Sequence, residues 1–251
     1  MKKKLITCLD VKNGELTKGI KFLDNVNLGD PVAAAKKYCE DGVDEVVLYD
    51  FSATHEKRET AFGLAEKVAK VVDKPFGVGG GIKSLEDCRA AFAAGSDKVH
   101  INSAAVKNPQ LLIEAVKEFG KGKIVLSTDV LATDKVPSGF EIVIDGGRTH
   151  TGIDAVEWAK QGEAAGVCEI VVNSIDADGM KTGFHIPSTR AIAQAVSIPV
   201  VASGGGGTVK HIYDVLTEGC AEVALVASML HYGEFTAGQI KAELIKMGLD
   251  I

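Results

Sequence analysis

The chain of 251 residues is 46% hydrophobic and 25% charged, and it carries a formal net charge of −6 at pH 7. These values are typical of a globular protein with one large domain or two small ones, and they exclude a disordered or fibrous chain. The negative balance argues against nucleic acid or an anionic membrane as the main partner, so we expect neither.

Short β-branched runs alternate with amphipathic, helix-like segments along the whole chain. We expect strands at 4–10, 45–50, 75–79, 97–102, 123–129, 169–174, 199–203 and 222–227. Strands separated by helices pair in parallel, and eight such units in about 250 residues match a closed (β/α)8, or TIM, barrel. An open doubly wound sheet usually has fewer strands and a nucleotide fingerprint after the first one, which residues 11–20 lack.

The sequence also repeats itself. At an offset of 124, residues 30–104 align without a gap on 154–228, with 17 identities in 75 positions. The repeat predicts a single domain, 1–251, built from two repeated half-barrels of approximately 1–120 and 121–251.

Two carboxylates end equivalent strands of the two halves. Asp10 ends the first strand and Asp129 the fifth, which places them on opposite sides of one barrel mouth, where barrel enzymes have their active sites. Such a pair can divide proton donation and acceptance between its members. The alternative is that each Asp caps a turn or a helix, and the symmetric pairing favours catalysis.

Each half also has a glycine cluster after its third strand and a small polar pair after its fourth. Glycine turns followed by a helix N-terminus expose backbone N–H groups and form anion sites. Glycines that only permit tight turns are the alternative, but a duplicated cluster favours a ligand with a phosphate at each end. The residues concerned are Gly80–Gly81, Asn102 and Ser103 in the first half, and Gly204–Gly205, Ala227 and Ser228 in the second, with Ser84 and Thr208 as expected helix N-caps.

Four charged residues begin strands and form what we call the basal ring: Lys4, Glu45, Lys98 and Glu169. From the residues alone, salt bridges at the stable end of the barrel are the favoured interpretation, and a gated passage is the alternative. Lys18 lies in a long segment after the first strand, where a solvated loop lysine is favoured over a lid lysine that binds phosphate.

The five cysteines are scattered without a paired spacing, which indicates a reducing, cytoplasmic location. No histidine and carboxylate spacing is typical of a metal site, so we expect no metal and no cofactor. His100, near the end of the fourth strand among apolar neighbours, is interpreted as a buried core histidine.

Motifs along nearly the whole chain resemble those of the cyclase subunit of imidazole glycerol phosphate synthase, from histidine biosynthesis. They are "CLDVKNGELTKG" (8–19), "DEVVLYDFSAT" (44–54), "VGGGIKSLED" (78–87), "DKVHINSAAVKNP" (97–109), "GGRTHTGIDAVEWA" (146–159), "NSIDADG" (173–179) and "ASGGGG" (202–207). The resemblance implies a lyase that takes ammonia from a partner glutaminase. Its substrate would be a ribulosyl aminoimidazole carboxamide nucleotide with two phosphates, converted to imidazole glycerol phosphate and aminoimidazole carboxamide ribonucleotide.

By position, the resemblance assigns the acid/base pair to Asp10 and Asp129 and places Lys18 in the lid loop. It assigns one phosphate to Gly81, Asn102 and Ser103 and the other to Gly205, Ala227 and Ser228, with Asp50, Asp178 and Ser203 lining the pocket. It implies that the basal ring is the entrance for ammonia. The ammonia would come from a glutaminase that forms a heterodimer with the chain at the N-terminal face of the barrel. Lys4 stands where an arginine is common, and His100 where a small residue is common.

Two other functions remain open at this point. One is the sister barrel isomerase of the same pathway, which shares the two halves, both phosphate sites and the paired acids. The other is a non-catalytic barrel that binds bis-phosphates. "CLDVK" (8–12) and the basal ring favour the cyclase, and intact Asp10 and Asp129 argue against a non-catalytic protein.

Overall fold

A closed barrel of eight parallel strands forms the centre of the computed structural model, which describes residues 2–20, 23–51 and 55–251. The barrel strands are β1 (Lys4–Lys12), β4 (Glu45–Asp50), β5 (Phe76–Gly79), β6 (Lys98–Ile101), β7 (Ile124–Ala132), β10 (Glu169–Ser174), β11 (Val200–Ser203) and β12 (Val223–Leu225). They pair in chain order, and the pairings of β12 with β1 and of β10 with β7 close the ring. The predicted (β/α)8 barrel and its eight strands are thus confirmed.

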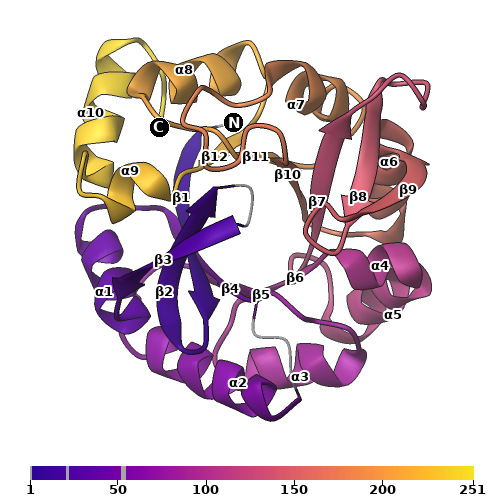
Figure 1. The fold of residues 1–251 in the computed structure, drawn as a ribbon, viewed down its shortest axis with the longest axis horizontal. Helices are drawn as coiled ribbons and strands as arrows, with labels where there is room; N and C mark the ends of the chain where they lie inside the picture. Colours follow the sequence, from indigo (N-terminus) through magenta and orange to yellow (C-terminus); the bar gives the residue numbers. More distant parts are fainter. Residues whose placement is uncertain (1, 21–22, 52–54) are drawn as a thin grey trace.

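Helices surround the barrel on its outside (Figure 1). They are α1 (Pro31–Glu40), α2 (His55–Ala69), α3 (Leu85–Ala93), α4 (Ser103–Lys107), α5 (Gln110–Phe119), α6 (Ala155–Ala165), α7 (Ile186–Ala193), α8 (Val209–Thr217), α9 (Ser228–His231) and α10 (Ala237–Lys246). The larger hydrophobic core lies between helices and strands and contains Trp158, which is fully buried. None of these helices is long and apolar enough to cross a bilayer, within the residues that the structure describes.

Several helices begin at side-chain caps. The Ser84 side chain accepts a hydrogen bond from the Asp87 N–H at the start of α3, and Thr208 accepts one from the His211 N–H at the start of α8. Both predicted N-caps are confirmed. The offset of 124 carries β4, β5 and α3 onto the bounds of β10, β11 and α8. The division into half-barrels of common origin stays a prediction that this agreement supports.

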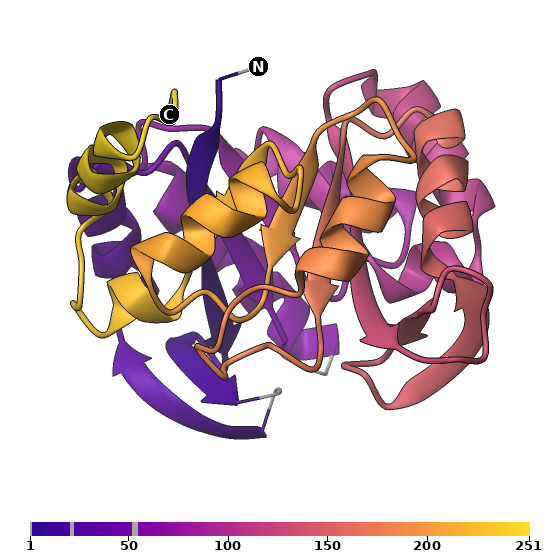
Figure 2. The same ribbon diagram turned by 90° about the horizontal axis from the view of Figure 1, so that it is seen from above.

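Two antiparallel hairpins were not predicted. They are β2 (Glu15–Ile20) with β3 (Leu23–Gly29), and β8 (Phe140–Ile144) with β9 (Thr149–Asp154). Asn13 and Gly14, both at positive φ, form the turn that folds β2 back onto β1, and an Asn-Gly pair is the strongest short hairpin signal in a sequence. Figure 2 shows both hairpins at one end of the barrel and the two chain termini at the other.

The barrel interior follows from the alternation of side chains along each strand, since every second residue points inward. A second hydrophobic cluster, separate from the core under the helices, fills this interior with Ile6, Cys8, Val47, Val125, Val171, Val201, Val223, Leu225 and Ala227. Continuing the alternation along β1 and β7 turns Asp10 and Asp129 inward at the mouth. Apolar residues therefore separate the basal ring from the carboxylates.

We predict that Thr208→Ala lowers the free energy of unfolding by about 1 kcal/mol, because the first turn of α8 loses the acceptor for one N–H. The midpoint of thermal unfolding should fall by about 2–4 °C. Thr217→Ala at the end of the same helix is the matched control, since its hydroxyl donates only to helix carbonyls. Equal midpoints for the two variants would contradict the capping role.

Candidate active site

Asp10 and Asp129 face each other across the mouth of the barrel. Asp10 lies near the end of β1 and Asp129 near the end of β7, and these two strands are four places apart in a ring of eight. Their environments differ, because Asp10 is half-buried whereas Asp129 is only 7% exposed. Two carboxylates in unequal surroundings are the arrangement that separates an acid from a base.

Asp129 is held by two amide groups, one from Asn102 directly after β6 and one from Asn173 on β10. Asn102 Nδ2 donates to Oδ2 at 3.0 Å, and Asn173 Nδ2 donates to Oδ1 at 2.9 Å. Burial raises the pKa of Asp129, the two amide donors oppose that rise, and the negative charge of Asp178 adds to it. The carboxylate is thus fixed in orientation while its proton affinity stays above that of an ordinary Asp.

Asn173 is a site residue that the sequence reasoning missed. Its Oδ1 accepts a hydrogen bond from Ser203 Oγ at 3.2 Å, so Ser203 acts on Asp129 through Asn173. The signal was present, because Asn173 precedes the last residue of β10 and the alternation that turns Val171 inward also turns Asn173 inward.

Asp10 is connected to the hairpin that follows its own strand. Thr17 Oγ1, on β2, donates to the Asp10 carbonyl oxygen at 3.2 Å, and Cys8 Sγ lies 3.6 Å from Oδ1 of Asp10. Lys18 follows on the same strand, and its backbone pairs with Val26 of β3. The side chain of Lys18 lies outside the described part of the chain, so its predicted lid role stays a prediction.

The first glycine turn follows β5. Gly80 and Gly81 have φ of 82° and 69°, and a Cβ at Gly80 would lie 2.2 Å from the carbonyl oxygen of Asp50. Only glycine permits both this conformation and this approach. The buried Asp50 therefore contributes its backbone to the turn. After β6, Ser103 begins α4, and its Oγ accepts a hydrogen bond from the Asp145 N–H at 3.2 Å.

The second glycine turn follows β11 and is equally crowded. Gly205 has φ of 101°, and a Cβ there would lie 2.1 Å from the Gly183 carbonyl oxygen. The Gly183 N–H donates to the Gly205 carbonyl oxygen at 2.8 Å, which joins the loop after β10 to this turn. After β12, Ala227 and Ser228 begin α9, and both are nearly buried. The structure thus places both sets of residues that were predicted to bind phosphate at strand ends around the mouth.

Three members of the basal ring form one ion-pair cluster at the opposite end. Lys98 Nζ lies 2.7 Å from Glu45 Oε2 and 2.7 Å from Glu169 Oε1. Burial raises the pKa of Glu45 although Lys98 opposes the rise, and the two glutamates raise the pKa of Lys98 although burial opposes it. Lys4 is exposed at the start of β1 and acts on Glu45 only at longer range.

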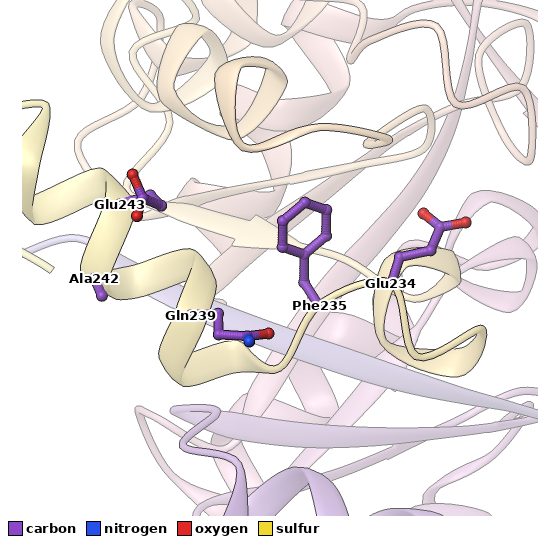
Figure 3. Close-up of a pocket in the computed structure, with 5 residues that line it drawn as sticks. All are labelled: Glu234, Phe235, Gln239, Ala242 and Glu243. Carbon is purple, nitrogen blue, oxygen red and sulfur yellow. The ribbon is translucent and has the colours of Figure 1, made fainter.

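One surface pocket lies elsewhere. It is lined by residues at and before α10, on the outside of the barrel (Figure 3): Glu234, Phe235, Gln239, Ala242 and Glu243. It contains none of the predicted site residues. Among the described residues, no group of three or more His, Cys, Asp or Glu side chains is placed to hold a metal ion.

The fold and the site define a (β/α)8 barrel protein with a polar site at its strand ends, and comparison with known proteins gives the family. The family model described as "Histidine biosynthesis protein" matches residues 4–236. Among similar curated proteins, the "Imidazole glycerol phosphate synthase subunit HisF" of Oleidesulfovibrio alaskensis is 51% identical over 251 residues, covering 99% of this chain and 97% of the relative.

Proteins of the same name from two other organisms agree. The relative from Desulfatibacillum aliphaticivorans is 50% identical over 254 residues, covering 100% of this chain and 98% of its own length. The relative from Nitratidesulfovibrio vulgaris is 49% identical over 251 residues, with 99% and 97% covered. The chain therefore belongs to the family of HisF subunits of imidazole glycerol phosphate synthase, which are enzyme subunits of histidine biosynthesis.

The pKa of Asp129 already lies above 3.8, the ordinary value for an aspartate. We predict that Asn173→Ala raises it further, since the charged form loses one hydrogen-bond donor. A pH titration of the Asp129 carboxyl carbon by NMR measures this directly. Asn27→Ala on the exposed strand β3 is the matched control and should leave that titration unchanged. A lower pKa in Asn173→Ala would contradict the stabilising role of the amide.

Proposed function

We propose that this chain is a lyase that catalyses the cyclase reaction of imidazole glycerol phosphate synthase. Ammonia adds to a ribulosyl aminoimidazole carboxamide nucleotide with a phosphate at each end. The adduct loses one water and is cleaved and cyclised to imidazole glycerol phosphate and aminoimidazole carboxamide ribonucleotide. The observation that carries the proposal is the pair of inward carboxylates, Asp10 and Asp129, in a chain similar over its whole length to HisF subunits.

Asp10 and Asp129 divide the proton transfers in this proposal. Asp129 retains a proton to higher pH than an ordinary Asp because it is buried, and its two amide partners keep its oxygens in place. Asp10 is more exposed and its backbone is bonded to the hairpin strand β2. Proton donation and acceptance at the two ends of the reacting fragment need such a pair on opposite sides.

The two glycine turns hold the two phosphates. Gly81, Asn102 and Ser103 bind one, and Gly205, Ala227 and Ser228 bind the other, while Asp50, Asp178 and Ser203 line the pocket between them. Two features support this assignment: a helix begins within a few residues of each turn, and both turns have positive-φ glycines whose N–H groups can point at an anion.

A glutaminase subunit docks at the N-terminal face in this proposal and forms a heterodimer with the chain, and its ammonia enters through the basal ring. The ring lies at the end of the barrel opposite the carboxylates, and an entrance there would be the one nearest to a partner at that face. We also propose a cytoplasmic location, in keeping with a biosynthetic role and five free cysteines in the structure.

The proposed reaction is tested by supplying the bis-phosphorylated ribulosyl substrate with ammonium salt to the isolated chain. Formation of both products is expected. Isomerisation of the aminoaldose precursor without an imidazole product would identify the sister isomerase, and substrate binding without turnover would identify a non-catalytic barrel. Pull-down of a glutaminase, followed by glutamine-dependent turnover, tests the partner.

We predict that Asp10→Asn and Asp129→Asn each lower kcat by about 10²–10⁴-fold, the range that general acid–base catalysis supplies. Substrate affinity, measured by calorimetry, should change only a few-fold because the phosphate sites stay intact. Asp30→Asn is the matched control, since Asp30 is an exposed helix N-cap and asparagine caps helices equally well. Unchanged turnover in either site variant would remove that residue from the acid/base pair.

We predict that Lys98→Met lowers the ratio of glutamine-dependent to ammonium-dependent turnover in the complex. It leaves the buried Glu45 and the partly buried Glu169 without their shared cation, so protein stability should fall by about 3–5 kcal/mol. Arg89→Met is the control, because it breaks an exposed pair with Glu118 and should cost at most about 1 kcal/mol. Equal ratios for Lys98→Met and the wild type would argue against entry through the ring.

A further inference from the structure

One residue of the β8–β9 hairpin contacts both ends of helix α4. The Asp145 N–H donates to Oγ of Ser103, the first residue of α4, at 3.2 Å. The two carboxylate oxygens of Asp145 accept from Nζ of Lys107, the last residue of α4, at 2.9 and 3.2 Å. Both ends of the helix are therefore tied to Asp145, one through its backbone and the other through its side chain.

The backbone of the hairpin turn is left-handed where it makes this double contact. Asp145, Gly146 and Gly147 follow β8 directly and have φ of 56°, 70° and 80°. Aspartate is one of the few residues besides glycine that tolerate such a conformation. A Cβ on Gly147 would lie 3.2 Å from the side chain of Ile175, which directly follows β10. The turn is thus held between α4 and the segment after β10.

The bond at Ser103 determines what the serine hydroxyl can do. A hydroxyl has one proton to donate and two lone pairs that accept. Because the Asp145 N–H takes a lone pair of Oγ, the hydroxyl keeps its own proton for another acceptor, and the accepted bond strengthens that donation. A phosphate dianion accepts hydrogen bonds through all its oxygens, so it is a ligand that suits this hydroxyl.

Helix α4 depends on such contacts for its position. It has only five residues, and the N-cap residue Asn102 makes no side-chain cap bond. A helix this short is not stable on its own, so neighbouring segments must hold it. The hydrogen bond from Lys107 lowers the pKa of Asp145, which keeps the carboxylate charged at neutral pH. The ion pair is exposed, so it contributes more to the position of α4 than to the stability of the fold.

We propose that Asp145 is a positioning residue of the first phosphate site and acts through Ser103. Its N–H orients the Ser103 hydroxyl for donation to the phosphate, and its ion pair with Lys107 holds α4 in the matching place. The inference rests on the proposed function, which assigns Ser103, with Gly81 and Asn102, to one phosphate. Phosphate binding is thereby coupled to the β8–β9 hairpin, although Asp145 itself does not contact the substrate.

The first test measures binding without catalysis. Inorganic phosphate is titrated into the ¹⁵N-labelled chain, and the amide signals of Ser103 and Asp145 are followed by NMR, with sodium chloride as the ionic-strength control. Saturable shifts of both signals are expected, and the Asp145 signal should stop responding in Ser103→Ala. A Ser103 signal that moves while the Asp145 signal stays still overturns the proposal. Silence of both signals contradicts the phosphate site of the proposed function instead, so the two failures are distinguishable.

The second test reverses the charge of Asp145 in the isolated chain, with ammonium as the nitrogen source. Asp145→Lys places two cations together and drives α4 away from the hairpin. The KM for the bis-phosphorylated substrate should rise about two- to tenfold, the worth of one hydrogen bond, while kcat stays nearly unchanged because Asp10 and Asp129 are intact. Adding Lys107→Glu restores an ion pair and should recover KM. The backbone tolerates lysine in this conformation, since Lys181 has φ of 57°.

Two comparisons separate positioning from a merely structural role. Glu243→Lys is the matched control, because it reverses an exposed carboxylate paired with Lys246 on α10 and should leave KM unchanged. In a Ser103→Ala background, Asp145→Lys should not raise KM further, because its effect passes through the missing hydroxyl. An unchanged KM in Asp145→Lys, no recovery with Lys107→Glu, or effects that multiply in the double variant overturn the proposal.

Discussion

The structure depends on one geometric constraint, the closure of eight parallel strands into a ring. Closure forces every second side chain of each strand into a common interior, so each strand must supply residues suited to a floor, a middle and a mouth. On β10 these residues are Glu169, Val171 and Asn173, and on β7 they are Val125, Ser127 and Asp129. The period of two thus gives a charge, an apolar residue and an amide in turn along β10, and an apolar residue, a hydroxyl and the Asp129 carboxylate along β7.

The same constraint explains why the two carboxylates are not equivalent. β1 and β7 stand opposite each other, but they have different neighbours. Asp129 lies between β6 and β10, and both supply an asparagine, whereas Asp10 receives a bond from the hairpin strand β2 to its backbone. The two carboxylates are therefore chemically distinct although their strands occupy opposite places in the ring, and the proposed division of proton transfers depends on that difference.

Sequence reasoning located the barrel strands and the two opposed carboxylates because the positions of both depend on local pattern. The eight strands are short β-branched runs, and Asp10 and Asp129 end two of them at matching places in the repeat. The β8–β9 hairpin was not predicted because β9 is largely polar and pairs with β8, its neighbour in the chain. Asn173, and the contact of His100 with Tyr49, escaped because both depend on which strands meet around the ring, and strand adjacency is a property of the fold rather than of local sequence.

The ion-pair cluster of the basal ring also has a mechanical consequence. Glu45, Lys98 and Glu169 come from β4, β6 and β10, and no two of these strands are neighbours, since β5 and β7 lie between them. The two ion pairs therefore link non-adjacent strands across the base of the barrel and fix the distances between them. Apolar contacts alone would be less specific about those distances. Strength at this end depends on charge, while the mouth is free to carry long hairpins and glycine turns. Neutralising Glu45 would therefore loosen the base of the barrel directly, because Lys98 would lose one of its two partners there.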